Sequence, residues 1–373
     1  MDKYRIAAFG FRSLPPQNGS AGADKFALEL YPRLVHKGFK VIAYNRLYGK
    51  ESFSITNYEG VELKYMHTTS ISGFDSLIHS MKATLHIIFF NTADLVHIHN
   101  GGNSIWSIPL RLFRKKVFIS QDGIDWKRNK WNWFGKLFLF LSSYLTAIIP
   151  NGVIFDNIYS KELYEKKFRR KYDFIPYGSE IPPVEYRNDI FERLGLLQKE
   201  YFLFVGRFIP DKGLHYLIEA FKSVKTNKKL VLVGGSPNPS QYEETIRNTQ
   251  DRRIVFPGYV YGTNVNVLMK YAYCYIQPSD VEGLSPVILT IMGLGTPLIC
   301  SNIAENIFIV GDTAITFKKG NSLDLAEKIS FVLLHADKLK ELSQNALIRV
   351  KERFSWENVI TEHIRVFSKN NFA

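Results

Sequence analysis

Short apolar runs alternate along the chain with segments whose apolar residues recur at helical spacing. Residues 6–9 form the first apolar run, and residues 26–35 then repeat apolar side chains every three or four positions up to Gly38. A second apolar run follows at 41–44. Short apolar runs predict strands and the longer spacing predicts a helix, so the chain opens as a strand–helix–strand unit of a parallel sheet.

The same alternation continues to residue 178 and starts again near residue 201. In the first half the predicted strands are 61–65, 95–98, 117–119, 153–155 and 174–176, and the predicted helices are 77–90, 105–113, 132–147 and 160–168. In the second half the predicted strands are 201–205, 230–233, 254–256, 273–276 and 297–300, and the predicted helices are 215–224, 240–249, 265–271, 287–294, 323–334 and 356–367.

A segment with two prolines and several charges, residues 179–188, separates the two alternations and is interpreted as a linker. We therefore expect an α/β protein of two doubly wound, Rossmann-like domains facing a cleft. The predicted domains are residues 1–178 and 179–355, followed by a closing helix in 356–373. Sheets of this kind bind ligands at the carboxyl ends of their strands.

The stretch around Glu282 combines a predicted strand, a short loop and a predicted helix. Pro286 suits the first turn of that helix. Such a turn points unpaired backbone N–H groups outward with the helix dipole behind them, which suits an anion. Glu282 beside it can accept hydrogen bonds from hydroxyl groups, so the stretch suits a sugar nucleotide. An ordinary loop with an exposed glutamate is the alternative interpretation.

Two cations, Arg207 and Lys212, follow the first predicted strand of the second half. Arginine can bind two phosphate oxygens and lysine supplies a point charge, so the pair can hold a diphosphate without a metal. Solvated loop charges are the alternative.

The early loop with Gly19 and Gly22 can bring amides to a phosphate or form a flexible turn. It lacks G-x-G-x-x-G, and no Walker A motif occurs, which argues against a nicotinamide or ATP enzyme.

The net charge of +13 favours acidic partners such as nucleotide phosphates, nucleic acid or anionic lipid. Residues 1–178 carry 25 Lys and Arg against 14 Asp and Glu, a net +11, which leaves +2 for the rest.

No signal-peptide pattern opens the chain, and its longest apolar run spans 14 residues, 137–150. A membrane span needs roughly 20, so this run predicts a core helix. Cys274 and Cys300 lie in apolar strands and are expected to be buried thiols in a reducing compartment.

A charged and aromatic cluster follows the strand at 117–119. Asp122, nearest the strand, can hold or deprotonate a sugar hydroxyl, and Trp126 beside Lys127 can stack on a sugar ring. An ion-pair cluster facing solvent is the alternative.

His97 and His99 lie in one strand and are expected to point to opposite faces, with His97 in the core and His99 lining the cleft. The sequence has no D-x-D and no Cys/His ligand set, so we predict no metal.

Together these residues resemble a family 4 glycosyltransferase on the GT-B fold. The most specific likeness lies in Gly206-Arg207 with Lys212-Gly213, Glu282-Gly283-Leu284, Gly295-Thr296-Pro297 and Phe354-Ser355-Trp356. The resemblance implies a retaining, metal-independent hexosyltransferase without a cofactor. It implies that Arg207, Lys212 and Gly22 contact the donor diphosphate. Glu282 and the amides of Gly283, Leu284 and Ser285 would hold the donor sugar and phosphate, and the final helix would return to the N-terminal domain.

A narrower likeness concerns residues 121–131, which are similar to bacterial rhamnosyltransferases of capsule and O-antigen synthesis. Many family 4 enzymes carry histidine where Asp122 stands. The chain departs from the family at Thr290, where a second glutamate usually grips the ribose hydroxyls. A charge-assisted hydrogen bond contributes roughly 1.5–3 kcal/mol, so this grip should weaken. Either the donor carries deoxyribose, as in dTDP, or the protein is a weak or inactive member.

The expected activity is transfer of a sugar from a UDP or dTDP donor to a glycan acceptor in surface-polysaccharide synthesis. The narrower likeness implies that the sugar is rhamnose, and we expect the acceptor to be lipid-linked. Glu282 and Asp122 are the expected catalytic residues, Thr290 belongs to the donor site, and His99, Trp126 and Lys127 to the acceptor site. We expect a cytoplasmic protein whose basic N-terminal half, including Arg111, Arg114, Lys115, Lys116, Lys127, Arg128 and Lys130, rests on anionic membrane lipid. The alternatives are a non-catalytic partner of another transferase and, on charge alone, a nucleic-acid binder, for which no recognition motif occurs.

Overall fold

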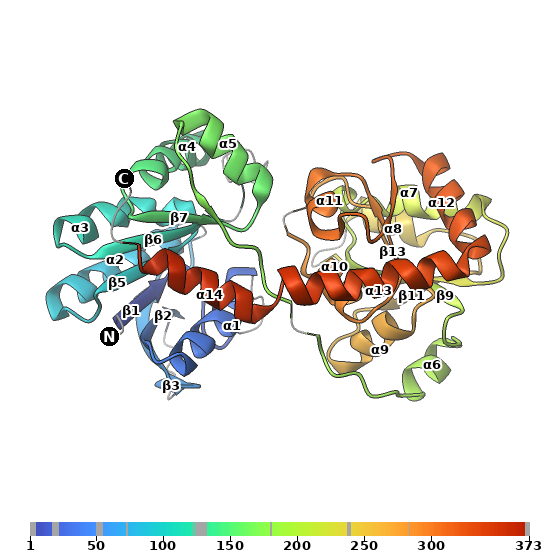
Figure 1. Ribbon diagram of the computed structural model, residues 1–373, viewed down its shortest axis with the longest axis horizontal. Helices are drawn as coiled ribbons and strands as arrows, with labels where there is room; N and C mark the ends of the chain where they lie inside the picture. Colours follow the sequence, from blue (N-terminus) through green and yellow to red (C-terminus); the bar gives the residue numbers. More distant parts are fainter. Residues whose placement is uncertain are drawn as a thin grey trace. The chain divides into compact units, whose positions relative to one another are not determined.

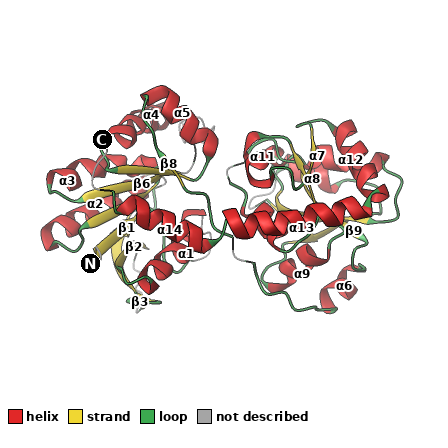
Figure 2. Cartoon of the chain, in the orientation of Figure 1, coloured by secondary structure: helices red, strands yellow, loops and turns green. Residues whose placement is uncertain are grey.

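The chain forms two compact α/β units, each built around one sheet (Figure 1). The computed structural model describes residues 5–16, 22–49, 55–71, 74–121, 123, 133–179, 181–236, 240–282 and 284–369. Unit 1 comprises residues 1–177 and 356–373, and unit 2 comprises residues 178–355. Helices surround the sheet in each unit (Figure 2). The predicted α/β class with doubly wound parallel sheets is confirmed.

Unit 1 has a sheet with the strand order β3-β4-β2-β1-β5-β6-β7-β8. Its neighbours are parallel except β3 and β4, which form an antiparallel pair. The strands are β1 (Arg5–Phe9), β2 (Lys40–Tyr48), β3 (Asn57–Tyr58), β4 (Val61–Thr68), β5 (Leu95–His99), β6 (Lys116–Gln121), β7 (Gly152–Phe155) and β8 (Asp173–Phe174). The chain moves outward from β1 to one side and then returns to place β5 on its other side.

Separate hydrophobic clusters cover the two faces of this sheet. The helices are α1 (Gly22–His36), α2 (Phe74–Phe90), the 3-10 helix η1 (Gly101–Trp106), α3 (Ser107–Leu112), α4 (Trp133–Ile148), α5 (Ile158–Phe168) and α14 (Trp356–Phe367). On one face α1 packs beside α14, although they lie at opposite ends of the chain (Figure 1). Phe26, Leu30 and Leu34 recur every four residues along α1 and bury one stripe against the sheet. The other face is covered by α2 and α3.

Unit 2 has a fully parallel sheet with the strand order β11-β10-β9-β12-β13-β14. The strands are β9 (Tyr201–Arg207), β10 (Lys229–Gly235), β11 (Ile254–Gly258), β12 (Cys274–Gln277), β13 (Leu298–Ser301) and β14 (Ile315–Phe317). The helices are α6 (Asp189–Leu194), the 3-10 helix η3 (Pro210–Lys212), α7 (Leu214–Ser223), α8 (Gln241–Arg247), α9 (Thr263–Tyr271), α10 (Pro286–Gly293), α11 (Ala304–Val310), α12 (Ser322–Leu334) and α13 (Ala336–Arg353). Cys274 and Cys300 are buried free thiols, as the apolar strands predicted.

Candidate functional site

The strand order of unit 2 places its candidate site between β9 and β12. The chain runs from β9 outward to β10 and β11 and then returns to β12 on the other side of β9. Such a reversal is a topological switch point, and open parallel sheets bind ligands there, outside the carboxyl ends of the strands. Arg207 and Lys212 follow β9, and Glu282 follows β12. The fold therefore places Glu282 at the same edge of the sheet as Arg207 and Lys212, although Glu282 lies far from both in the sequence.

Backbone contacts hold the two loops of this site against each other. The Asp280 N–H donates to the Asp211 carbonyl at 2.9 Å. Gly213 has a φ of +65°, and a Cβ at this position would lie 2.1 Å from the Pro278 carbonyl oxygen. Only glycine fits such a close approach in this conformation. The loops after β9 and β12 therefore have little freedom to move apart.

The Glu282 carboxylate is the centre of a polar cluster. Its Oε1 accepts hydrogen bonds from Lys212 Nζ at 2.5 Å, Gln277 Nε2 at 2.5 Å and Ser279 Oγ at 2.6 Å. The Glu282 side chain is 8% exposed and that of Lys212 is 18% exposed. Within the described part of the chain, no hydrogen bond reaches Glu282 Oε2. One oxygen is thus anchored by the protein, and the other can accept a hydrogen bond from a ligand.

A buried second layer orients the groups that hold Glu282. The Tyr275 hydroxyl donates to Gln277 Oε1 at 2.7 Å, which turns the amide nitrogen of Gln277 toward Glu282. Burial raises the pKa of Tyr275 well above its usual value, so this hydroxyl keeps its proton. The Ser301 hydroxyl donates to the Ser279 carbonyl at 2.5 Å and accepts from Asn306 Nδ2 at 3.0 Å. The sequence analysis missed Gln277 and Ser279, although a polar residue ending an apolar strand was a usable signal.

Arg207 differs from Lys212 in having no partner. Arg207 ends β9, and its side chain is exposed. That side chain forms no ion pair or hydrogen bond with any residue that the structure describes. Lys212 Nζ has three hydrogens, and Glu282 takes one of them. Both cations therefore keep donors for an anionic ligand.

Helix α10 begins beside the cluster, as the sequence predicted. Pro286 is its first residue, and the preceding Ser285 provides no side-chain cap, so first-turn N–H groups have no capping partner from that side chain. Leu284 is half-buried and Ser285 is buried, while Gly283 lies outside the described residues. Thr290 lies one turn into α10, and its hydroxyl donates to the Pro286 carbonyl at 3.1 Å.

The candidate residues of unit 1 are described only in part. Asp122, Trp126 and Lys127 lie outside the described residues. Gly22 is the first residue of α1, and a Cβ there would lie 3.5 Å from the Tyr177 hydroxyl, an ordinary contact. The structure therefore gives no steric reason for glycine at position 22.

The two histidines of β5 contradict the sequence analysis. His97 Nδ1 and His99 Nε2 both bond the Tyr31 hydroxyl of α1, at 2.9 and 2.6 Å. The expectation that they point to opposite faces was wrong, because residues two positions apart in a strand share a face. His99 is also buried, with 1% of its surface exposed, and packs in the core beside α1. In this unit it does not line an open surface.

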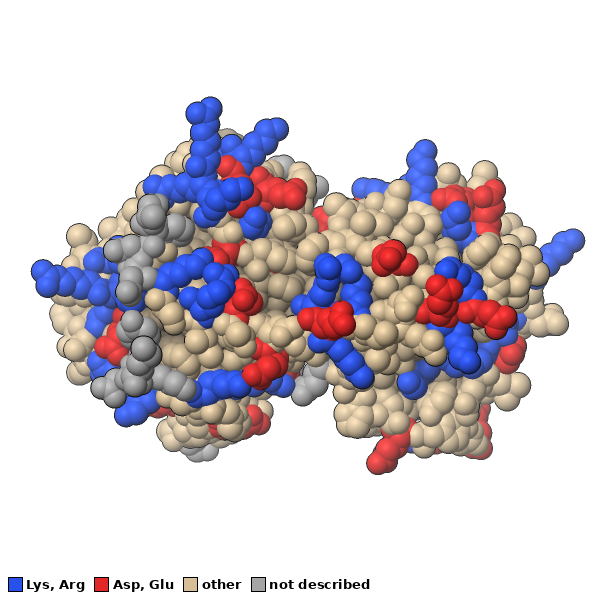
Figure 3. Space-filling view, viewed as in Figure 1, with Lys and Arg blue, Asp and Glu red and all other residues tan. Residues whose placement is uncertain are grey.

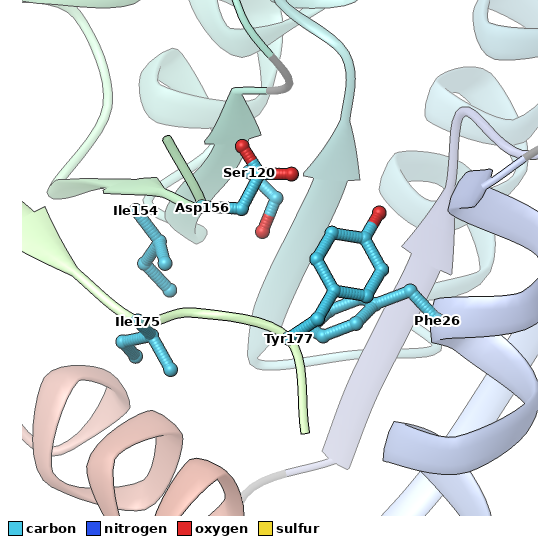
Figure 4. Close-up of a pocket in the computed structure, with 6 residues that line it drawn as sticks. All are labelled: Phe26, Ser120, Ile154, Asp156, Ile175 and Tyr177. Atoms are coloured by element: carbon cyan, nitrogen blue, oxygen red, sulfur yellow. The ribbon is translucent and has the colours of Figure 1, made fainter. Parts of the chain in front are cut away.

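Unit 1 has a small cavity near the carboxyl ends of β6 and β7 (Figure 4). Its lining residues are Phe26, Ser120, Ile154, Asp156, Ile175 and Tyr177. The oxygen atoms of Ser120 and Asp156 lie together on one side, and the rings of Phe26 and Tyr177 lie on the other (Figure 4). The space accommodates about one water molecule, so it is too small for a sugar.

The part of the chain that the structure describes holds neither a candidate membrane span nor a candidate metal cluster. No helix there is both long and apolar enough to cross a bilayer. No cluster of three or more histidine, cysteine, aspartate or glutamate side chains there has the arrangement of a metal site.

Comparison with known protein families gives a match within unit 2. Residues 187–349 match the family model of glycosyl transferases group 1. The chain is 26% identical over 202 residues to the O-antigen chain mannosyltransferase B of Escherichia coli, covering 52% of this chain and 51% of that protein. It is 25% identical over 275 residues to the D-rhamnosyltransferase WbpZ of Pseudomonas aeruginosa, covering 70% and 67%. The match to the first of these relatives thus covers about half of that protein's length.

Among solved structures, the chain resembles Anabaena Alr3699/HepE in complex with UDP-glucose, with a TM-score of 0.77. That match has 16% identity and covers 98% of this chain and 99% of the other. At this identity the likeness shows the fold, which is GT-B. The resemblance to glycosyltransferases of capsule and O-antigen pathways, predicted from the motifs, is confirmed.

Proposed function

We propose that this protein is a retaining glycosyltransferase that moves a sugar from a nucleotide diphosphate to a glycan acceptor in surface-polysaccharide synthesis. The observation that carries this proposal is the cluster at the switch point of unit 2. Two cations with unused donors and a half-anchored carboxylate lie there beside the start of α10. The family match over residues 187–349 covers all of these residues.

Arg207 and Lys212 would neutralise the leaving diphosphate. The guanidinium of Arg207 can bind two phosphate oxygens, and Lys212 Nζ can donate to a third while keeping its bond to Glu282. Fixed donors of this kind stabilise the charge that develops on the leaving group. The first-turn N–H groups of α10 would add to the same field.

Glu282 would orient the donor sugar through Oε2. Because Lys212, Gln277 and Ser279 hold Oε1, the carboxylate cannot turn away when a sugar hydroxyl binds. The acceptor hydroxyl would attack the anomeric carbon on the face from which the nucleotide leaves, and its proton would pass to the departing phosphate. The carbon–oxygen bond to phosphate breaks as the new glycosidic bond forms, so the anomeric configuration is retained. Asp122 would orient a hydroxyl from unit 1.

The comparisons support the choice of substrates. HepE was solved with UDP-glucose, which supports a UDP donor, and the relative named as a D-rhamnosyltransferase supports a rhamnose donor. The relative named for the O-antigen chain supports a growing glycan as acceptor. We propose that this glycan is lipid-linked and is met at an anionic membrane surface.

Thermal unfolding with a panel of UDP-, dTDP- and GDP-sugars should identify the donor. The matching donor is expected to stabilise the protein by ~2.7 kcal/mol at a hundred times its dissociation constant. Nucleoside monophosphates serve as the control and should stabilise less, because they lack the second phosphate for Arg207 and Lys212. The proposal fails if no nucleotide diphosphate shifts the unfolding temperature and no sugar is released from any donor.

A non-catalytic partner of another transferase is the second candidate, and Thr290 is the observation that favours it. Its hydroxyl donates to the carbonyl of Pro286, one turn earlier in α10, and it carries no charge for the ribose hydroxyls.

Substitution of Thr290 by glutamate separates the two candidates. A carboxylate there can accept from both ribose hydroxyls, so UDP affinity should rise by about tenfold and dTDP affinity by less, because dTDP lacks the 2′-hydroxyl. Thr290→Ser is the matched control and should leave both affinities unchanged. Isothermal titration measures the affinities, and sugar release measures turnover. Turnover in the T290E variant alone, with none in the native protein, would favour the non-catalytic candidate.

A further inference from the structure

The two helical layers of unit 1 differ in what they expose. The described helices α1 and α14 expose no large apolar side chain. On the opposite face, α2, η1–α3 and α4 expose many, including Phe89 at 77%, Leu112 at 77% and Phe134 at 74%. A helix facing water normally has a polar outer surface. This contrast within one unit indicates that the second layer contacts something other than water.

Most of the exposed apolar residues form an outward stripe on each helix, and Phe74, Phe90 and Phe134 are exposed beside these stripes. The stripes are Leu85 and Phe89 on α2, Ile105, Ile108 and Leu112 on η1–α3, and Trp133, Leu137, Phe140, Leu141, Tyr144 and Ile148 on α4. Their spacing of three or four residues is that of one helix face. Together these residues form the outer face of unit 1.

The helices that carry the outer face are neighbours. Both α2 and α4 pack against η1, which continues directly into α3. Lys115 Nζ bonds Asn91 Oδ1 and the Ala93 carbonyl, which ties the end of α3 to the end of α2. Arg111 bonds Asn151 at 2.8 Å, which ties α3 to the loop after α4. The three stripes therefore form one continuous surface.

The charges on this layer are mostly positive. Asp75, in the first turn of α2, is the one carboxylate of its four helices, and it is paired with Arg46. The segments 76–93, 95–121 and 133–148 contain no aspartate or glutamate. Lys82, Arg111 and Arg114 are exposed, and Lys136 is half-buried in α4. Lys115 does not belong to this set, because it is buried and bonded, contrary to the expectation that it faces lipid. Basic side chains lie at the edge of unit 1 near α3 and α5 (Figure 3).

We infer that the outer face binds the headgroup region of an anionic lipid bilayer. Aromatic and aliphatic side chains enter the interface, while lysine and arginine near them bind lipid phosphates. Helix α4 has 16 residues, about 24 Å at 1.5 Å per residue, which is shorter than the bilayer core. The layer therefore lies on the membrane. A second copy of the chain fits poorly, because two predominantly cationic faces would repel each other.

Sedimentation of the full chain with lipid vesicles tests this inference independently of any transferase activity. Phosphatidylcholine vesicles with about 30% phosphatidylglycerol should bind the protein, and pure phosphatidylcholine should bind it at least about tenfold less. Raising the salt from about 0.1 M to about 1 M should weaken the binding, because the Debye length falls from ~10 Å to ~3 Å.

Two paired substitutions locate the binding surface. Phe89→Ser with Leu112→Ser should lower vesicle binding by at least about tenfold, since two large apolar side chains leave the interface. Leu323→Ser with Leu334→Ser is the matched control, because these residues are 75% and 80% exposed on α12 of unit 2. Circular dichroism checks that both variants stay folded. Equal binding by both variants would overturn the inference. It would also be overturned if the native protein is a dimer that does not bind vesicles and the Phe89/Leu112 variant is a monomer.

Discussion

Replacing Lys212 by methionine is expected to lower kcat/KM for sugar transfer by about a hundredfold to a thousandfold, the usual cost of removing one donor to developing charge. Methionine keeps much of the length of the side chain but removes the ammonium group. Gln277 and Ser279 still hold Glu282 Oε1, so the carboxylate should keep its position. The loss should therefore lie in the diphosphate contact and not in the fold.

Affinity for UDP against UMP shows where the effect acts. The Lys212→Met variant should bind UDP less tightly and UMP with unchanged affinity, because the lysine contacts the diphosphate in this mechanism. Lys225→Met is the matched control, since Lys225 is exposed between the end of α7 and the start of β10, at the opposite edge of the sheet from the cluster. Isothermal titration and initial rates give both quantities. If kcat/KM and UDP affinity match those of the control variant, Lys212 serves only to pair with Glu282.

The residues of the proposed site could be located from the sequence because they follow strand ends. Parallel strands buried on both faces read as plain apolar runs, so the positions just after β9 and β12 could be located within one or two residues. Arg207, Lys212 and Glu282 all lie there. Their pairing across the sheet could not be predicted, because strand order is decided by packing. The bonds from Gln277 and Ser279 to Glu282 depend on that packing and were missed.

Other elements were missed for local reasons. Helix α13 has 18 residues, but its buried positions are few and lie among many charges, so the segment resembles a loop. Strand β14 has three residues, too few for a clear alternation. The error at His97 and His99 was different, since strand geometry alone places both on one face. Correct use of that rule would have predicted the buried histidine group of unit 1.

That group makes the stability of unit 1 sensitive to acid. Burial lowers the pKa of His79 and His99 to about 3 and that of His363 to about 4, and it holds the pKa of His97 well below its usual value. Below pH 6.5 these residues take up protons in the unfolded chain but stay neutral in the folded one. The free energy of unfolding is therefore highest above pH 6.5 and falls as the pH drops toward 4. Each histidine contributes about 2 kcal/mol of this loss between pH 7.5 and 5, against a typical total of 5–15 kcal/mol.

Urea unfolding followed by tryptophan fluorescence measures unit 1 alone, because all five tryptophans lie in its residues.

His363 is the most informative position. Its Nδ1 donates to the Val359 carbonyl at 2.8 Å, and its buried Nε2 has no partner among the described residues. His363→Leu should shrink the loss between pH 7.5 and 5 by roughly 2 kcal/mol, since one buried titrating group is removed. His67→Gln, at an exposed histidine of the same unit, should leave the loss unchanged. Equal losses in both variants would show that carboxylates, and not buried histidines, govern the acid response of unit 1.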